Sequence, residues 1–500
     1  MPFDPAHHVN LVKGKFAKTS ASDMDGMFAA FSASGRQTLV IHFHGGLVSE
    51  ESALKTASLL QKPYEDAGAY PIFIVWETGI LEVAQNSWAR IAGETVFKIL
   101  VDRVAGFAAG KLKQALGLKG LVTKEGKVDD NELAYSAETG DFSKAIIGQD
   151  ELDAFRATPS DLSESDESFI TSQLEADFDL VGAIQGAVNS IEPPSQVTKS
   201  GHVVAIQASH ETLMAPAALQ QFSSAPGGKG IVNPLSVAKA VMTIIAKVVK
   251  RFVQGRDHGL HATVVEEILR SLYIGNIGEA VWGAMKSYPR DAFGADPSEF
   301  GGTRLLDRLA GLPAGTRVVL VGHSAGSIYI SEIVEQIRKQ NVSIRFDVVY
   351  LAPAVRTDRA VEVLGQGNWP VDGFRMYTMG DDWESKDVLV SQVPFFYPRS
   401  LLYFISGILE GGDDVPLLGM QRYLAINKWF SDDPNVAAMR NWLYSAPNRI
   451  CFCPSSGSVG LEANARSHGD FDELDWKLKD GKLEANSTIA SLQHVIKNGF

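Results

Sequence analysis

Residues 317–326 have the sequence RVVLVGHSAG, in which an apolar run leads into a turn with a glycine two residues to either side of a serine. The apolar run predicts a buried strand, and residues 327–339 have the spacing of a helix. Ser324 is therefore expected at a sharp strand-to-helix turn. Gly322 and Gly326 have no Cβ, so the strand and the helix can pack closely around it.

Other apolar runs of strand length occur on both sides of this turn along the chain. They are TLVIHF (38–43), YPIFIVW (70–76), FDVVYLA (346–352), FRMYTM (374–379) and RICFC (449–453). Helical spacing separates the first two, from residue 50 to about residue 67. Strands that alternate with helices predict an α/β protein with a doubly wound, mostly parallel sheet.

The strand runs divide the 500 residues into three parts. Residues 1–79 and 311–500 are expected to form the two halves of the α/β core, and residues 80–310 an insertion between them. The insertion is predicted to be mainly helical, with one strand candidate at 202–208. Residues 128–179 are rich in Asp, Glu and Ser, which predicts a solvated, partly mobile stretch.

Composition excludes several classes of protein. The formal net charge of -13 argues against a nucleic-acid partner, because phosphate contacts need clustered Lys and Arg. We expect Cys451 and Cys453 to be reduced core residues, since their spacing in a strand is unsuited to a bridge between them. We find neither a secretory signal pattern nor a long enough apolar run for a membrane span, so a cytoplasmic protein is predicted.

A serine hydroxyl is a poor nucleophile at neutral pH and needs a nearby base. Two histidines follow the turn along the chain: His468, in the polar loop SHGDFDELD, and His494, on an amphipathic C-terminal helix. A loop beyond the last strand can reach the carboxyl edge of the sheet, whereas a histidine on such a helix is typically structural. We therefore predict His468 as the base.

The base in turn needs an acid that orients it, and in hydrolases the acid lies between the serine and the histidine along the chain. Asp381 and Asp382 follow the strand FRMYTM after a single glycine, and either would serve. Asp358, after the preceding strand, is a third choice. The commonest role of any one aspartate in a loop is to cap a turn or helix.

Acyl transfer also needs two N–H donors that point at the developing oxyanion. The amide of Ala325, directly after the serine, would be one. The glycine turn after residues 38–43 offers the second, from Gly46 or Leu47. We expect His44 to brace this loop. His42 and His44 lack convincing further ligands, so no metal and no cofactor are predicted.

Taken together, these motifs resemble the α/β-hydrolase superfamily of serine esterases and lipases, especially bacterial hydrolases of uncharacterised function. The likeness covers about residues 36–79 and 315–475, whereas the insertion has no recognised counterpart. It implies an α/β-hydrolase fold with the insertion as a cap, and a serine hydrolase that cleaves carboxylic esters through an acyl-enzyme on Ser324.

Three alternatives stay open. A thioesterase or a serine peptidase would use the same residues, and a hydrolase-like scaffold would bind a ligand without turnover. The substrate would be a small-molecule or lipid ester.

Residues 237–253 place apolar side chains on one face and Lys or Arg on another. This pattern is typical either of a cap helix packed on the core or of an interfacial helix in peripheral contact with a membrane.

Overall fold

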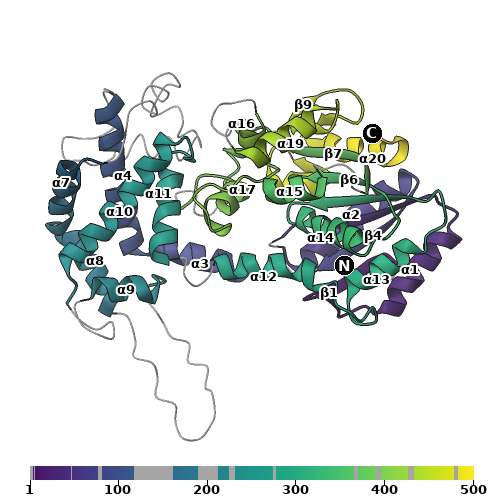
Figure 1. Cartoon of the computed structure of the whole chain (residues 1–500), viewed down its shortest axis with the longest axis horizontal. Helices are drawn as coiled ribbons and strands as arrows, with labels where there is room; N and C mark the ends of the chain where they lie inside the picture. Colours follow the sequence, from purple (N-terminus) through teal and green to yellow (C-terminus); the bar gives the residue numbers. More distant parts are fainter. Residues whose placement is uncertain are drawn as a thin grey trace, which may run out of the picture.

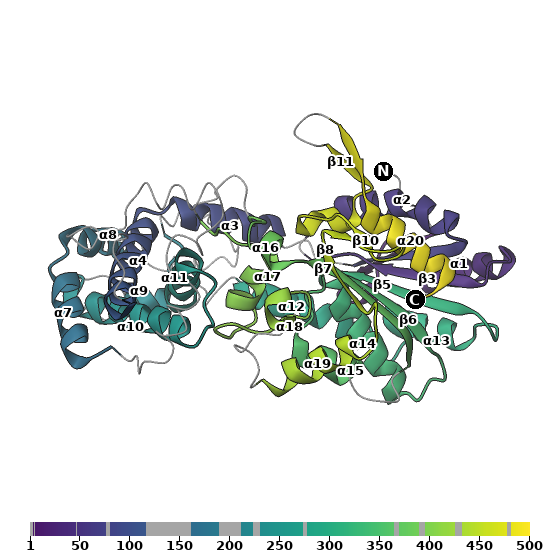
Figure 2. The same ribbon diagram turned by 90° about the horizontal axis from the view of Figure 1, so that it is seen from above.

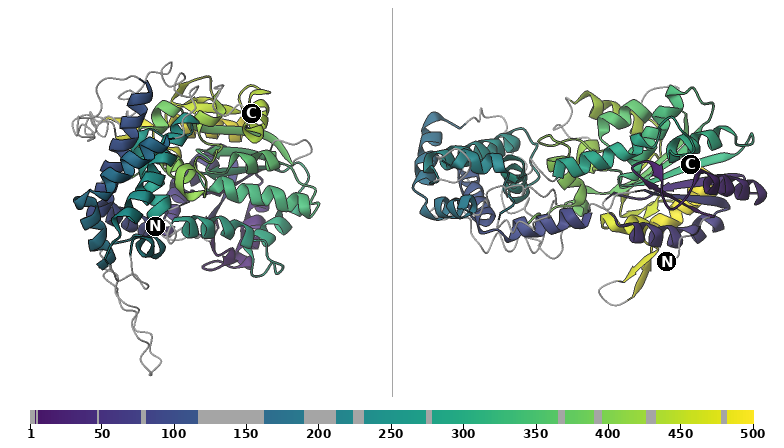
Figure 3. Two further views of the ribbon diagram at one scale, coloured as in Figure 1. Left: turned by 60° about the vertical axis from the view of Figure 1, so that its left-hand side comes forward. Right: turned by 90° about the horizontal axis from the view of Figure 1, so that it is seen from below.

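The computed structural model of this chain has two lobes, one built on a β-sheet and one purely helical in the part described (Figure 1). The described residues are 4, 6–46, 48–76, 81–116, 162–189, 212–223, 231–273, 278–364, 370–389, 396–425, 433–477 and 482–500. Seen from above, the two lobes lie at opposite ends of the molecule (Figure 2), and the right-hand view of Figure 3 shows the same separation.

The sheet has eight strands in the order β2-β1-β4-β3-β5-β6-β7-β8. All neighbours are parallel except β1 and β2, which are antiparallel. The strands are β1 (His8–Val12), β2 (Lys15–Phe16), β3 (Thr38–Phe43), β4 (Ala69–Trp76), β5 (Arg317–His323), β6 (Phe346–Leu351), β7 (Val371–Met379) and β8 (Ile450–Cys453). The predicted α/β class and mostly parallel sheet are confirmed.

All six predicted strands are present, as β3 to β8. Every residue of β4 is buried, which explains its unbroken apolar run, because a strand covered on both faces has no polar side. We did not predict β1, which pairs with β4 and adds a seventh strand beside it. Its residues alternate polar and apolar side chains and include two that are buried although polar, His8 and Asn10.

Helices cover both faces of the sheet. The helices of the sheet lobe are α1 (Ala21–Ala33), α2 (Glu50–Asp66), α13 (Gly301–Ala310), α14 (Gly326–Lys339), α15 (Thr357–Leu364), α16 (Asp381–Glu384), α17 (Leu401–Phe404), α18 (Gln421–Leu424), α19 (Pro434–Tyr444), α20 (Ser487–Asn498), the π-helical turn η3 (Ile405–Leu409) and the 3-10 helix η5 (His468–Asp472). One core joins α2 and α20 to the sheet, and a second joins α1, α13 and α14 to its other face.

Short two-stranded ribbons complete the sheet lobe. They are β9 (Ser455–Ser456) with β10 (Glu462–Ala463), and β11 (Asp475–Lys477) with β12 (Leu483–Ala485). The buried Cys451 and Cys453 on β8 are both free thiols, as expected.

Between β4 and β5 all described elements are helical. Besides α13, they are α3 (Leu81–Gly93), α4 (Thr95–Leu116), α7 (Glu164–Glu175), α8 (Phe178–Asn189), α9 (Pro216–Phe222), α10 (Pro234–Val253), α11 (Leu260–Ile268), the π-helical turn η1 (Leu269–Tyr273) and α12 (Gly278–Asp291). Helices α3 and α12 run between the lobes (Figure 1), and α12 packs against α14 and η3. The strand candidate at 202–208 lies outside the described residues.

The described part of the acidic stretch is helical, although the sequence predicted a solvated excursion. Ser163 and Asp166 form a capping box at the start of α7. Ile170 and Leu174, four residues apart, are both buried on one face of that helix. This acidic segment therefore still has enough apolar residues on one face to pack as a helix.

Helix α10 lies at the centre of the helical lobe and packs against α4, α7 and α11. Its apolar face is buried, while Lys239, Lys247 and Lys250 are exposed. The face that would enter a membrane interface is thus covered by protein. Arg251, which the sequence placed on the charged face, is buried and pairs with Glu266. Within the described residues, none of the helices has the length and apolar content that crossing a bilayer requires.

Candidate functional site

Ser324 occupies a strained turn between the end of β5 and the start of α14. Its φ is +50°, in the left-handed region that side-chain-bearing residues rarely adopt. The turn is so tight that a Cβ on Gly326 would lie 2.2 Å from the carbonyl oxygen of Phe43, and a Cβ on Gly322 would lie 2.8 Å from Ile330 Cδ1. Both glycines are therefore required for the close packing that the sequence predicted.

Hydrogen bonds from the neighbouring strand end hold this conformation. The Ser324 N–H donates to the carbonyl oxygen of Leu351 at 2.8 Å, and the Ser324 carbonyl accepts from the Ala354 N–H at 3.0 Å. Ser327 Oγ donates to the same carbonyl at 2.6 Å. Ala352, between the two partners, also has a positive φ, of +42°. Two strained residues thus sit side by side where β5 and β6 end, a clustering typical of functional sites.

The glycine loop after β3 lies directly on the turn. A Cβ on Gly45 would approach Ser324 Cβ to 3.3 Å, and a Cβ on Gly46 would approach Ala325 Cβ to 2.9 Å. From the other side, a Cβ on Gly46 would lie 2.7 Å from the Sδ of Met285, a residue of α12. The loop is therefore enclosed between the serine turn and a helix of the insertion, and only glycine fits at Gly46 without displacing a neighbour.

The same loop is braced by His44. Its Nε2 accepts the Trp76 N–H at 3.1 Å, so Nδ1 carries the proton and donates to the carbonyl oxygen of Gly45 at 2.6 Å. Burial lowers the pKa of His44 to about 4, which keeps the ring neutral. Among the described residues, no hydrogen bond uses the N–H of Ala325. Leu47, the other predicted oxyanion donor, lies outside the described residues.

His468 is brought next to the turn by η5, the 3-10 helix that follows β8. Its ring lies 5.1 Å, between centroids, from the ring of His323, the residue before Ser324. The side chain is 9% exposed, and neither ring nitrogen has a hydrogen-bond partner among the described residues. Burial, reinforced by the neighbouring His323, lowers the pKa of His468 to about 3. The imidazole is thus neutral at pH 7 and free to accept a proton.

The three aspartates singled out from the sequence differ in their surroundings. Asp381 accepts a hydrogen bond from Tyr403 Oη at 2.7 Å, and Asp382 is exposed at the start of α16. Asp358 pairs with the arginine two residues before it. Within the described residues, no hydrogen bond or ion pair joins any of these carboxylates to His468.

A different aspartate, Asp387, reaches His468. Its Oδ2 accepts the backbone N–H of His468 at 2.7 Å. Burial raises the pKa of Asp387 to about 6, and the nearby charge of Asp470 adds to this effect. Sequence reasoning missed Asp387 because it searched directly after β7, whereas this residue follows a further turn of helix, α16. Its sequence neighbourhood carries no signal that distinguishes it from a surface loop.

A second carboxylate, Asp472 at the end of η5, contacts His323. Asp472 Oδ2 lies 3.1 Å from His323 Nδ1, and the carbonyl oxygen of His468 lies 3.1 Å from His323 Nε2. Burial alone would raise the pKa of Asp472, but the charge and hydrogen bond of His323 hold it below its usual value. The sequence analysis did not single out Asp472, because its partner is 149 residues away.

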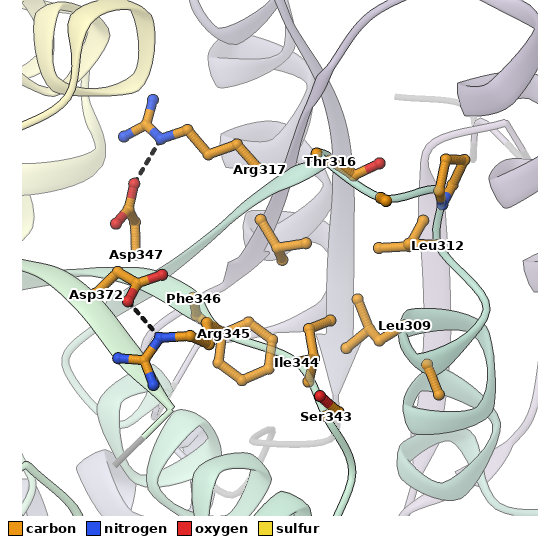
Figure 4. A pocket seen from close by; sticks show the side chains of 15 residues that line it. Leu309, Leu312, Thr316, Arg317, Ser343, Ile344, Arg345, Phe346, Asp347 and Asp372 are labelled. Atoms are coloured by element: carbon orange, nitrogen blue, oxygen red, sulfur yellow. Dashed lines mark hydrogen bonds and ion pairs between the residues drawn. The ribbon is translucent and has the colours of Figure 1, made fainter. Parts of the chain in front are cut away.

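The structure also has a pocket of about 460 Å³, drawn in Figure 4, at the opposite edge of the sheet. It is formed where β5, β6 and β7 begin, and Leu309, Leu312, Ile344 and Phe346 line its apolar side. Its charged side chains pair with each other, Arg317 with Asp347 and Arg345 with Asp372. Because Ser324 lies at the carboxyl ends of the strands, this pocket does not belong to the serine site.

No protein-family model, no curated protein and no solved structure matches this chain. The account of the site therefore rests on its own geometry.

Proposed function

We propose that this chain is a serine hydrolase of the α/β-hydrolase type that cleaves carboxylic esters through an acyl-enzyme on Ser324. The observation that carries the proposal is the conformation of Ser324: a positive φ at a strand-to-helix turn, with glycines where a Cβ would collide. Such a turn stores backbone strain and presents a hydroxyl at the edge of a parallel sheet beside a helix N-terminus.

The order of the functional groups along the chain supports the proposal. Ser324 follows β5, Asp387 follows β7 and His468 follows β8. Because these strands run parallel in one sheet, the segments that follow them emerge at one edge of the sheet. Serine, acid and histidine therefore occur in the order that hydrolases of this type use. We propose Asp387, in place of Asp381 or Asp382, as the acid.

In the proposed reaction Ser324 Oγ attacks the ester carbonyl carbon while His468 takes the hydroxyl proton. The carbonyl oxygen gains the negative charge, and the N–H groups of Ala325 and of the 45–47 loop stabilise it. His468 then gives its proton to the leaving alcohol, which leaves an acyl group on the serine. Water, activated by the same histidine, releases the acid and restores the serine.

A pKa of about 3 makes His468 a weak base, so the proposed proton transfer needs a carboxylate near its ring. His468 is neutral before the reaction and becomes an imidazolium in a buried position, which costs free energy unless a carboxylate is near. Asp387 binds the backbone N–H of His468, and the charge of Asp472 also acts on the ring. Among the described residues His468 makes no hydrogen bond to Ser324. Catalytic hydrogen bonds commonly tighten only when substrate binds.

Labelling with a fluorophosphonate probe tests the proposal, because such probes react with activated serines. The native chain should label once, and peptide mapping should place the label on Ser324. Ser324→Ala and His468→Ala should abolish labelling, whereas Ser445→Ala, a serine at the end of α19, should label like the native chain. Labelling that persists in Ser324→Ala would overturn the assignment.

Two observations favour a second candidate, a ligand-binding scaffold without turnover. Ser324 is only 2% exposed, and neither ring nitrogen of His468 has a hydrogen-bond partner among the described residues. A native chain that fails to label with small and large phosphonates would favour the scaffold. If it labels, a panel of p-nitrophenyl esters, thioesters and peptide anilides separates the esterase from the thioesterase and the peptidase.

A further inference from the structure

His323 links the serine turn to the helix that carries His468. Its ring projects from the end of β5, one residue before Ser324, and is 5% exposed. Nδ1 lies 3.1 Å from Asp472 Oδ2 at the end of η5, and Nε2 lies 3.1 Å from the carbonyl oxygen of His468 at its beginning. One side chain therefore holds both ends of η5 against the strand that bears the serine.

Both nitrogens of this ring have a partner. A carboxylate and a carbonyl oxygen are both hydrogen-bond acceptors, so each ring nitrogen is directed at an acceptor. Because both nitrogens are occupied, His323 has no free nitrogen to take the proton of Ser324. It does not compete with His468 for the role of base.

Several further titratable groups face this pair. His42 on β3 and His44 after it interact electrostatically with Asp472, as does Tyr64 of α2. Burial lowers the pKa of His42 to about 3, so this ring is neutral, and its Nδ1 is paired with Tyr64 Oη at 2.8 Å. Glu473, next along the chain, feels the charge of Asp472. Among these described groups, Asp472 alone contacts the ring of His323.

We propose that His323 and Asp472 are positioning residues, which fix the place of His468 relative to Ser324 through the backbone of η5. The inference rests on the proposed function, because it assigns to this pair the geometry of the Ser324–His468 proton transfer. Displacements of about 1 Å between a nucleophile and its base can lower a rate by about 100-fold. The hydrogen bond between His323, next to Ser324, and the carbonyl oxygen of His468 limits such displacement.

Two replacements of His323 separate its two hydrogen bonds. The amide nitrogen of a glutamine reaches the place of Nε2 and keeps a donor for the His468 carbonyl, whereas that of an asparagine reaches only the place of Nδ1. The rate of phosphonate labelling at Ser324, and kcat and KM for p-nitrophenyl butyrate, would be measured from pH 4.5 to 9. Asp472→Asn provides a second probe of the pair, and His494→Gln on α20 is the control. Thermal melting would confirm that each variant is folded.

For His323→Asn we expect kcat to fall by about 100-fold with KM within about 2-fold, whereas His323→Gln should stay within about 10-fold of the native chain. His494→Gln should match the native chain in rate and in pH profile.

Equal rates for folded His323→Asn and native chain would overturn the positioning role. If both His323 variants fail to fold, Asp472→Asn decides: kcat lowered at least about 10-fold with KM unchanged supports the role, and unchanged kcat overturns it. These results are distinct from failure of the proposed function, in which the native chain itself does not label at Ser324.

Discussion

The backbone N–H of His468 donates a hydrogen bond to Asp387 Oδ2 at 2.7 Å, which joins the segment after β7 to the segment after β8. Two residues that are 81 positions apart thus meet at one edge of the sheet, beside Ser324. Burial makes this carboxylate costly to ionise, and its pKa rises to about 6. Carboxylates whose pKa is shifted by burial are frequent at functional sites.

Asp387→Asn should lower activity and raise stability at the same time. The carboxyl has a higher pKa in the folded chain than in the unfolded chain, where it is about 3.9, so its stabilising effect is present below about pH 4 and is lost as pH rises through 6. At pH 8 the ionised form costs about 3 kcal/mol, of which the neutral amide should recover about 1–2 kcal/mol.

Melting of both chains at pH 4.5 and pH 8 measures this effect. The variant should gain stability relative to the native chain mainly at pH 8, while its kcat for p-nitrophenyl butyrate falls by about 100-fold or more. Asp382→Asn, an exposed neighbour on α16, is the matched control for stability and should change melting little at either pH. Unchanged activity in Asp387→Asn would remove this residue from the proposed reaction.

Gly326→Ala should unfold or strongly destabilise the sheet lobe. The added Cβ would lie 2.2 Å from the carbonyl oxygen of Phe43. The Cβ is bonded to the backbone of α14 and the oxygen belongs to the backbone of β3, so neither can move without disturbing one of these elements. We expect a loss of at least about 3 kcal/mol. Gly283→Ala is the matched control, because a Cβ there meets nothing within 4 Å and a helix interior favours alanine by about 1 kcal/mol. Similar melting of the two variants would contradict the close packing described here.

Backbone strain at Ser324 can be measured separately from its chemistry. Neither Ser324→Gly nor Ser324→Ala has a hydroxyl, but glycine adopts the observed φ of +50° with little strain. The glycine variant should therefore be more stable than the alanine variant by about 1 kcal/mol. In an unstrained helix or strand the order would be reversed. A more stable Ser324→Ala in chemical denaturation would thus argue against the strained turn.

Acid should destabilise the chain through its buried neutral histidines. The pKa of His468 is lowered to about 3 in the folded chain and is about 6.5 when unfolded. The unfolded chain therefore binds the proton first, and the stability that is present above pH 6.5 is lost as pH falls towards 3. His468→Gln does not titrate, so its melting temperature should fall less steeply between pH 6.5 and pH 4 than that of the native chain. Parallel melting curves across this range would contradict the burial of His468.

Much of the sheet followed from local sequence, because strands buried on both faces are unbroken apolar runs. Residues 38–43 and 69–76 are such strands. Strand β1 is not such a run: it carries the buried polar residues His8 and Asn10, which are hydrogen-bonded to Asp4 and Thr19. Its position beside β4 depends on tertiary contacts that no local pattern records.

The candidate site, like the sheet, could be predicted from the sequence only in part. Ser324 and the glycine loop could be found because their backbone conformation demands glycine at fixed positions. The partners of His468 and His323 could not, since Asp387 and Asp472 resemble ordinary acidic loop residues and acquire a role only through contacts 81 and 149 residues away. The predicted Asp381 instead accepts a hydrogen bond from Tyr403, a residue of α17, for which no helix was predicted.

The central claim is that Ser324 becomes covalently acylated during turnover. Mixing the native chain with excess p-nitrophenyl butyrate and quenching in acid within the first turnover tests this most directly, with intact mass and peptide mapping as the readout. We predict a burst of about one p-nitrophenolate per chain and one butyryl group on the peptide that contains Ser324. Release of p-nitrophenolate without an acyl group on Ser324, or an acyl group mapped to another residue, would contradict the account.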